Sequence, residues 1–343
     1  MASNGFGLLY RFTTWGESHG SCIGVTIDGI PADFPLDLDW LNKDLQRRKP
    51  GTSKLVSSRK EEDSFTILSG FFEGRTTGAP LSFSFLNQDV RKKDYEKNLS
   101  VIRPGHADYT YGIKYQNYDP YGGGRSSARE TIGRVVAGSI AAQFLKEWGI
   151  VVQGELTRVG SVSEDTEGMR QEALKAKQDG DSVGGQVVVR ASGVPAGIGE
   201  PVYEKLDARL AYALMSINAV KAVEIGDGVD VAGKRGSENN DQMNADGFLS
   251  NHCGGILGGI STGEEIFVRI SLKPTPSIFC EQNTINSRGE ATKLKLRGRH
   301  DPCVAFRAVV VAEAMVSQVL LDMILMAMAN GSTHLKLDWR QRS

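Results

Sequence analysis

The sequence predicts an α+β protein, and three observations support that prediction. Several short segments alternate apolar and polar residues, which is typical of strands with one buried face. Other segments place apolar residues three or four positions apart, which is typical of helices packed on a core. Near the C-terminus, residues 302–329 are almost continuously apolar. A chain of 343 residues can bury a substantial core, in one large domain or two.

The periodicity locates the individual elements. Three helices are predicted before the C-terminal stretch. Residues 38–48 carry Leu38, Leu41 and Leu45 on one face, 131–148 carry a stripe from Ile132 to Trp148, and 206–217 form a shorter helix of the same kind. The predicted strands are 23–27, 81–86, 186–191 and 266–272.

The segment 302–329 is predicted to be a long buried helix. Pro302 suits the first helical position, and Asp301 before it is the expected N-cap. The segment is apolar nearly all round, which favours burial inside a helical layer. Four polar residues argue against a membrane span: Arg307, Glu313, Gln318 and Asp322.

Composition restricts the possible functions. The net charge is −1, so the chain lacks the basic field that a nucleic-acid-binding protein uses. Its loop cations instead lie beside Gly, Ser and His, which favours a small, multiply charged anion as ligand. The N-terminus lacks the layout of a signal peptide, so a cytoplasmic location is expected. The widely spaced cysteines are predicted to be reduced and mostly core-filling, without a metal: Cys22, Cys253, Cys280 and Cys303.

Residues 122–130, Gly-Gly-Gly-Arg-Ser-Ser-Ala-Arg-Glu, form the most informative segment. The glycines allow the backbone to approach a ligand closely. Ser127 and Glu130 have the spacing of a capping box, so a helix is expected to start here and present free N–H groups to an anion. Arg125 and Arg129 add guanidinium groups that match phosphate or carboxylate. The alternative is a flexible turn before a capped helix.

Histidines recur in similar loops, at 16–20, 103–108 and 298–303. A histidine beside glycine and a charged or hydroxyl side chain is suited to proton transfer near neutral pH. The alternative for each is a solvated polar residue, and both interpretations stay open at this point.

Together these segments resemble the chorismate synthase family. Its three signature regions correspond to GESHG at 16–20, GRSSARETIGRVVAG at 124–138 and RHDPC at 299–303. The least similar stretch is about 150–180. Further similar stretches lie between these three regions, with the order preserved: RRKPGTSK at 47–54, LSGFFEGRTTGAP at 68–80, RPGHADYTY at 103–111, MSINAVKAVEIGDG at 215–228 and NHCGGILGGISTG at 251–263.

The resemblance implies a fold and a reaction. The implied fold is one domain over 1–343, a β-α-β sandwich with long helices between antiparallel sheets, assembled as a homotetramer. The implied reaction is the anti-1,4-elimination of phosphate from 5-enolpyruvylshikimate 3-phosphate to give chorismate, the last common step of the shikimate pathway for aromatic amino acid biosynthesis. It requires reduced FMN without net redox change. NADPH would act only indirectly, through flavin reduction by an external reductase.

The resemblance also implies roles for residues at matched positions. His19 resembles the residue that protonates departing phosphate, and His106 the one that serves the reduced flavin. Asp301 resembles the carboxylate of the proton relay, with Ser18 and Ser127 as supporting hydroxyls. The implied substrate-binding residues are Arg48, Lys54, Arg103, Arg125 and Arg299. The implied flavin-binding residues are Arg125, Ser126, Ser127, Asn218, Ala219, Gly258, Lys273, Pro274, Thr275, Pro276, Ser277 and Arg299.

Two alternatives remain at the level of the sequence. A bifunctional member of the family would carry an intrinsic NAD(P)H-dependent flavin reductase, but such members contain inserted sequence that this compact chain lacks. A non-catalytic protein could use the arginine loops to bind anions or RNA, which the balanced net charge and the paired histidine loops argue against. His300 and His334 receive no role and are expected to tolerate replacement by alanine.

Overall fold

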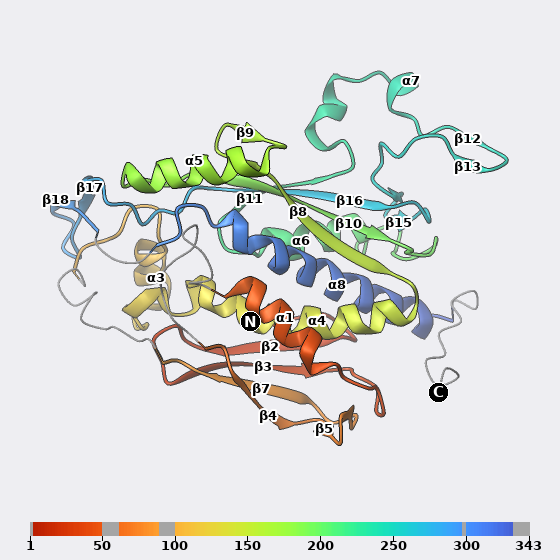
Figure 1. The fold of residues 1–343 in the computed structure, drawn as a ribbon, viewed down its shortest axis with the longest axis horizontal. Helices are drawn as coiled ribbons and strands as arrows, with labels where there is room; N and C mark the ends of the chain where they lie inside the picture. Colours follow the sequence, from red (N-terminus) through yellow and green to blue (C-terminus); the bar gives the residue numbers. More distant parts are fainter. Residues whose placement is uncertain (1–2, 50–61, 89–99, 297–299, 332–343) are drawn as a thin grey trace.

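Two antiparallel sheets enclose a layer of helices, as Figure 1 shows. The computed structural model describes residues 3–49, 62–88, 100–296 and 300–331. The first sheet has the order β1 (Gly5–Phe6), β2 (Arg11–Gly16), β3 (Cys22–Asp28), β7 (Leu81–Leu86) and β4 (Phe65–Ser69). The second has the order β11 (Val220–Ile225), β16 (Ile266–Leu272), β10 (Gly185–Ser192), β8 (Val151–Val159) and β9 (Val162–Ser163).

The helices between the sheets are α1 (Leu38–Arg48), α4 (Thr131–Glu147), α6 (Leu206–Met215) and α8 (Ala305–Ala329). Helix α4 packs on β3 of the first sheet, whereas α8 packs on β8 and β10 of the second, and the two helices pack on each other. The fold therefore confirms the expected α+β sandwich, and all four predicted strands lie within β3, β7, β10 and β16.

Smaller elements decorate the sandwich. Helix α5 (Thr166–Gln178) contacts β8 and β9, so the stretch least similar to the family forms an edge of the second sheet. A segment with η3 (Gly228–Gly233), α7 (Gly236–Asn239), β12 (Met243–Asn244) and β13 (Gly247–Phe248) projects away from the body in Figure 1. The remaining elements are α3 (Asp108–Tyr115), η1 (Tyr121–Ser126), η2 (Ala128–Glu130), β5 (Phe71–Phe72), β6 (Arg75–Thr76), β14 (Ile256–Leu257), β15 (Ile260–Ser261), β17 (Gln282–Ile285) and β18 (Ala291–Leu294).

Helix α8 is the buried helix that its sequence predicts. Among the described residues it is the one helix long and apolar enough to cross a membrane, but 78% of its most apolar window is buried inside the protein. Its polar residues have partners in the core. The Asp322 carboxylate accepts the backbone N–H groups of Leu8, Leu9 and Tyr10, and the Gln318 amide donates to Arg134 O. These two side chains therefore satisfy backbone groups, among them the N–H of the buried Tyr10.

The expected helix caps are partly wrong. Helix α8 begins at Ala305 with Val304 as N-cap, because the Asp301 carboxylate instead accepts a charge-assisted bond from Arg307 Nη1 at 2.9 Å. Ser127 does accept the N–H of Arg129, at 3.4 Å, but this caps the short η2 turn, and α4 starts at Thr131. The reciprocal half of the capping box is missing, because the Ser127 N–H donates to Gly124 O.

The four cysteines are free thiols. Of the four, only Cys303 is buried in the core, so the prediction that most of them fill the core is wrong.

Gly138 sets the closest approach of α4 and α8. A Cβ added at Gly138 would lie 2.2 Å from the Cβ of Ala314 and 2.3 Å from its Cα. Backbone at this distance cannot rotate aside, so the helices would have to separate. We expect Gly138→Ala to destabilise the protein by about 1–3 kcal/mol, the usual cost of overpacking a core, measured by urea unfolding.

Gly112 is the matched control for this prediction. It lies in helix α3, and an added Cβ would meet nothing within 4 Å. Gly112→Ala should leave stability unchanged or raise it by about 0.5–1 kcal/mol, since alanine has the higher helix propensity. Equal unfolding midpoints for the Gly138 variant and the wild type would show that the two helices are not in tight contact there.

Candidate active site

Most of the predicted site segments meet at the end of the helical layer where α4 and α8 begin. Arg125 in η1 donates from Nη1 to Gly16 O at 3.2 Å, and Asn218 after α6 donates from Nδ2 to Ser126 O at 2.9 Å. Lys273 after β16 donates from Nζ to Gly105 O at 2.8 Å. Figure 1 shows α3 and the β17–β18 hairpin at the same end of the molecule. The tertiary fold thus joins loops that are far apart in the sequence.

Gly122, the first of three glycines in η1, makes room for His19. Gly122, Gly123 and Gly124 all have positive φ, at 61°, 81° and 51°. A Cβ on Gly122 would lie 2.0 Å from His19 Nδ1, so only glycine allows this backbone to pass the imidazole. His19 is buried, with 7% of its surface exposed, and its Nδ1 lies 3.2 Å from the Ser18 hydroxyl. The alternative of a solvated loop histidine is therefore wrong for His19.

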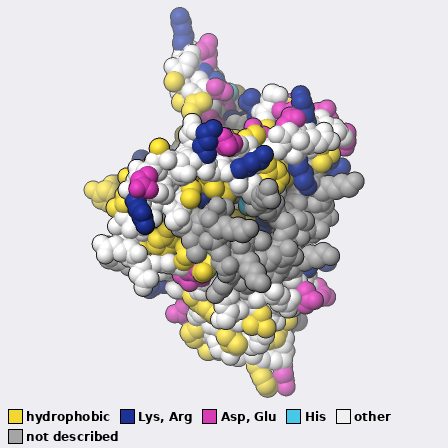
Figure 2. Space-filling model, turned by 90° about the vertical axis from the view of Figure 1, so that its left-hand side faces the viewer, with side chains coloured by type: hydrophobic (Ala, Val, Ile, Leu, Met, Phe, Trp, Pro, Cys, Tyr) yellow, Lys and Arg dark blue, Asp and Glu magenta, His cyan; other side chains and the backbone are white. Residues whose placement is uncertain are grey.

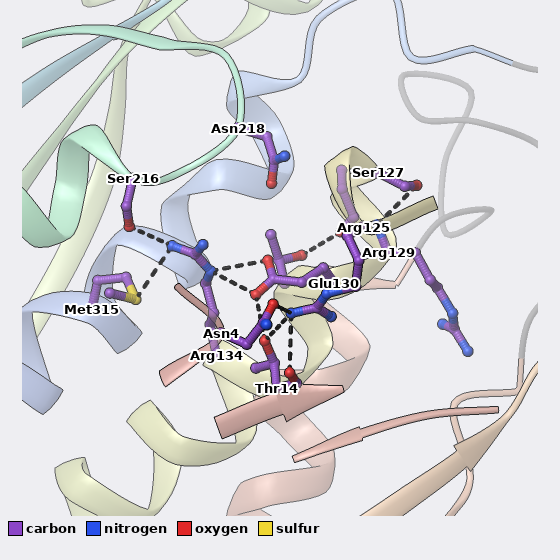
Figure 3. Close-up of polar contacts among 12 residues, drawn as sticks. Asn4, Thr14, Arg125, Ser127, Arg129, Glu130, Arg134, Ser216, Asn218 and Met315 are labelled. Carbon is purple, nitrogen blue, oxygen red and sulfur yellow. Dashed lines mark hydrogen bonds and ion pairs between the residues drawn. The ribbon is translucent and has the colours of Figure 1, made fainter. Parts of the chain in front are cut away.

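Arg125 fixes the arginine turn to the first sheet. Its Nη2 donates to Thr14 O at 3.0 Å and to Thr14 Oγ1 at 2.7 Å. Figure 3 shows that this contact continues from Thr14 Oγ1 to the Glu130 carboxylate, 3.0 Å away, and from there to Arg134 and Ser216. The guanidinium group predicted to bind an anion is therefore also part of the network that shapes the site.

His106 is held in one tautomer by its neighbours. Its Nδ1 lies 3.0 Å from Pro104 O, which can only accept, so Nδ1 carries the proton. Its Nε2 lies 2.7 Å from Ser277 Oγ and accepts from that hydroxyl. Burial, and then the nearby Arg103, lower the pKa of His106 to about 4, so the ring is neutral at pH 7. Arg103 is itself paired with Asp108, which accepts from Nε at 2.7 Å and Nη2 at 2.6 Å.

The segments 218–219 and 273–277 form a cradle beside His106. Lys273 N donates to Ala219 O at 2.9 Å, which joins the two segments side by side. Ala219 has a positive φ of 71°, a strained backbone for a residue with a side chain. Asn218 Oδ1 and Thr275 Oγ1 are buried here, and neither has a hydrogen-bond partner among the described residues. A hydrogen-bonding ligand would supply the partners that these two buried atoms lack.

Arg48 lies in the same region, in a network that contains two residues that the sequence analysis missed, Asp63 and Asn87. Its Nη2 donates to Asp63 Oδ2 at 2.5 Å, and Asp63 also pairs with Arg129. Asn87 accepts from Arg129 Nε at 3.2 Å and donates to Glu17 O and Gly20 O at 3.0 and 2.9 Å, which connects these cations to the His19 loop. A lone aspartate and a lone asparagine between loops have no sequence pattern that could have identified them.

Asp301 and His300 lie at the entrance to α8. Asp301 pairs with Arg307, whose Nε donates to Arg48 O at 2.8 Å, so the carboxylate is close to the Arg48 region. His300 was given no role and was expected to tolerate replacement by alanine. Its ring lies 6.3 Å from that of Phe279, and its Nε2 is buried without a hydrogen-bond partner among the described residues. His300 therefore lies near the predicted site, close enough for its charge to affect His106, and its tolerance of alanine stays a prediction.

One predicted site position, Gly258, lies apart from this cluster, and two others are not described. Lys54 and Arg299 lie outside the described residues, as does His334. Gly258 lies in the β14–β15 hairpin, where the adjacent Gly259 O accepts from Leu206 N at the start of α6. Asn218 follows the other end of that ten-residue helix, which is about 15 Å long by the rise of an α-helix. Within one chain, Gly258 is therefore separated from the rest of the predicted flavin site.

The described residues contain no group of three or more His, Cys, Asp or Glu side chains that could hold a metal ion. Their chemistry consists of buried guanidinium groups, two positioned imidazoles, and unpartnered amide and hydroxyl atoms. Such a site can bind a phosphorylated, carboxylated substrate and an aromatic cofactor with polar edges, and it can hold protons at the two histidines.

Comparisons with known proteins agree with this chemistry. A family model described as chorismate synthase matches residues 10–325. A solved structure titled "Crystal Structure of Chorismate Synthase" is 30% identical, with a TM-score of 0.72 over 93% of this chain and 92% of that chain. The match to the family spans every segment of the site just described, from the His19 loop to the start of α8. The chain therefore belongs to the chorismate synthase family, whose members are lyases that eliminate phosphate from 5-enolpyruvylshikimate 3-phosphate to give chorismate.

Proposed function

We propose that this chain performs that elimination with reduced FMN, at the site between His19, His106 and Arg48. The observation that carries the proposal is the meeting of a buried cation cluster, two positioned histidines and an unsatisfied polar cradle at one end of the helical layer. In the reaction, one C–H bond and the C–O bond to phosphate break and a new double bond forms. The substrate loses a proton and phosphate, so there is no net oxidation or reduction.

The cradle fits the flavin that the family generally uses. A reduced isoalloxazine presents N–H donors and carbonyl acceptors, which match the unpartnered Asn218 Oδ1 and Thr275 Oγ1. The residues proposed to hold FMN are 125–127, 218–219 and 273–277, with Arg299 and Gly258 retained from the family resemblance. When bound, reduced FMN supplies the transient electron density that assists C–O cleavage and a basic position for the substrate hydrogen.

The side chains of the chain have separate proposed tasks. Arg48 binds the phosphate group, assisted by Lys54, Arg103, Arg125 and Arg299. His19, positioned by Ser18 and Gly122, donates a proton to the departing phosphate. His106, neutral and fixed by Pro104, serves the flavin without adding a charge beside it. Asp301, at the same end of the site, takes part in the relay of the substrate proton, and Ser127 is a supporting hydroxyl that orients its partners.

The remaining properties follow from family membership. We propose a cytoplasmic homotetramer that receives reduced flavin from an external reductase, with NADPH used only by that reductase. A nucleic-acid ligand is disfavoured by the surface: Figure 2 shows acidic as well as basic side chains on the described part of the face that carries this end of the molecule. An RNA-binding protein would also lose affinity steeply with salt and need no flavin.

Activity is expected to require reduced FMN although none is consumed. The described site offers no side chain basic enough to remove the unactivated substrate proton unaided. The test is an anaerobic assay with 5-enolpyruvylshikimate 3-phosphate, following chorismate absorbance and phosphate release. Chemically reduced FMN should support turnover, and oxidised FMN with NADPH alone should not.

Two outcomes would change this proposal. Turnover in air without added or bound flavin would refute the flavin requirement. Turnover with oxidised FMN and NADPH, in the absence of any other protein, would identify the bifunctional form instead.

A further inference from the structure

Asp63 is a buried carboxylate shared by two cations of the site. Its side chain is 0% exposed, and those of Arg48 and Arg129 are 1% and 3% exposed. Asp63 Oδ2 accepts from Arg48 Nη2 at 2.5 Å, and Oδ1 accepts from Arg129 Nη1. Arg48 ends α1 and Arg129 lies in η2, so one carboxylate fixes cations from two separate elements.

Asp63 belongs to a larger cluster of charged side chains. Arg307 donates to Asp301 and to the backbone of Arg48, which brings a third guanidinium group to the cluster. Arg48, Arg129 and Arg307 thus share one cluster with the carboxylates of Asp63 and Asp301. Burial lowers the pKa of Arg48 to about 10, so it stays protonated at neutral pH. Burial would raise the pKa of Asp63, but Arg48 and Arg129 lower it below its usual value, so this carboxyl group stays ionised.

Arg48 also retains unused donors. Its Nε and Nη1 are buried and have no hydrogen-bond partner among the described residues. A buried charged donor without an acceptor is costly, so the site favours an anion that approaches from this side. The Asn87 contacts keep the cation cluster attached to the loop that carries His19, the proposed proton donor.

We propose that Asp63 is a positioning residue that sets the affinity of this site for phosphate. Its carboxylate holds Arg48 and Arg129 side by side and cancels one of their two charges. The substrate phosphate is then bound by fixed guanidinium groups, while the product phosphate is held weakly enough to dissociate. This inference rests on the proposed function, in which Arg48 binds the phosphate group.

The test compares wild type with Asp63→Asn, using inorganic phosphate as the probe in isothermal titration calorimetry. Asparagine has nearly the same size and tolerates the positive φ of 54° at this position. The variant removes the negative charge that is paired with Arg48, the proposed phosphate ligand, so phosphate should bind at least about tenfold more tightly. Phosphate release should slow, and kcat should fall while the substrate KM does not rise.

Asp33 provides a matched control on the exterior of the same protein. It also has a positive φ, 69°, and also accepts from an arginine, Arg75, at 3.1 Å. Its side chain is 71% exposed, so solvent screens its charge. Asp33→Asn should leave phosphate affinity and kcat unchanged.

A second comparison, made in a protein that already lacks Arg129, keeps the test decisive if Asp63→Asn alone does not fold. Removing one partner of a buried ion pair is strongly destabilising, whereas removing both is better tolerated. We therefore compare Arg129→Gln with Arg129→Gln/Asp63→Asn, and again expect at least about tenfold tighter phosphate binding in the protein that lacks the carboxylate.

Unchanged or weaker phosphate binding on loss of Asp63, in both backgrounds, would overturn the inference. The proposed function fails in a different way. If Arg48→Ala left phosphate affinity unchanged, the phosphate site itself would be misplaced. If Arg48→Ala weakened phosphate binding but Asp63→Asn did not strengthen it, only the role of Asp63 would be wrong.

Discussion

Replacing His19 with glutamine is expected to lower kcat by about 10²–10⁴-fold, the usual effect of losing a general acid. Glutamine offers an amide in place of the imidazole and still fills the space beside Gly122 and the Ser18 hydroxyl. It cannot donate and regain a proton at neutral pH, so departing phosphate would have to leave unprotonated. The measurement is steady-state chorismate formation under anaerobic conditions with saturating reduced FMN.

His19→Ala should lose activity to a similar extent but also lose stability, because the ring is buried. The glutamine variant therefore separates chemistry from packing. His252 is the matched control, since it lies between the projecting segment and β14 and contacts Asp227 and Lys234 rather than the site. His252→Gln should retain nearly full kcat. A His19→Gln enzyme with close to wild-type kcat would assign His19 a structural role.

Much of the fold could be predicted from the sequence because helix periodicity and strand alternation are local signals. The predicted bounds 38–48 coincide with α1, and 81–86 and 266–272 coincide with β7 and β16. Helix ends were less predictable, since they depend on tertiary partners. Asp301 could have capped α8 by its position in the sequence, but Arg307 offered its carboxylate a stronger, charge-assisted partner.

The site was predictable only where residues form motifs. Gly122 to Arg129 and the two histidine loops are recognisable in the sequence, yet their mutual contacts are not. No local pattern indicates that Gly122 must be glycine to admit His19, or that Ser277 pairs with His106. Asp63 and Asn87 were missed for the same reason, because a buried polar residue is defined by partners that are distant in the sequence.

Replacing His106 with alanine is expected to change the flavin environment as well as the rate. We expect kcat to fall by about 10²–10⁴-fold, as for other lost acid–base groups. Because the proposed partner of His106 is the flavin, His106→Ala should also shift the pH at which bound reduced FMN loses its N1 proton. The absorbance spectrum of that complex with a substrate analogue reports this titration, and His19→Gln should leave it nearly unchanged.

The low pKa of His106 adds a test that needs no ligand. In the folded protein its pKa is about 4, below the ordinary value of about 6.5. Between these two pH values, the unfolded chain binds more protons at this histidine than the folded protein does. The stabilising contribution of the neutral ring to the free energy of unfolding is therefore complete above about pH 6.5, and it is lost as the pH falls towards 4. His106→Ala should therefore lose less stability than wild type between pH 6.5 and 4 in urea unfolding. Identical flavin titrations in the His19 and His106 variants would refute the separate roles of the two histidines. Identical dependence of stability on acid pH in wild type and His106→Ala would show that burial does not hold His106 neutral.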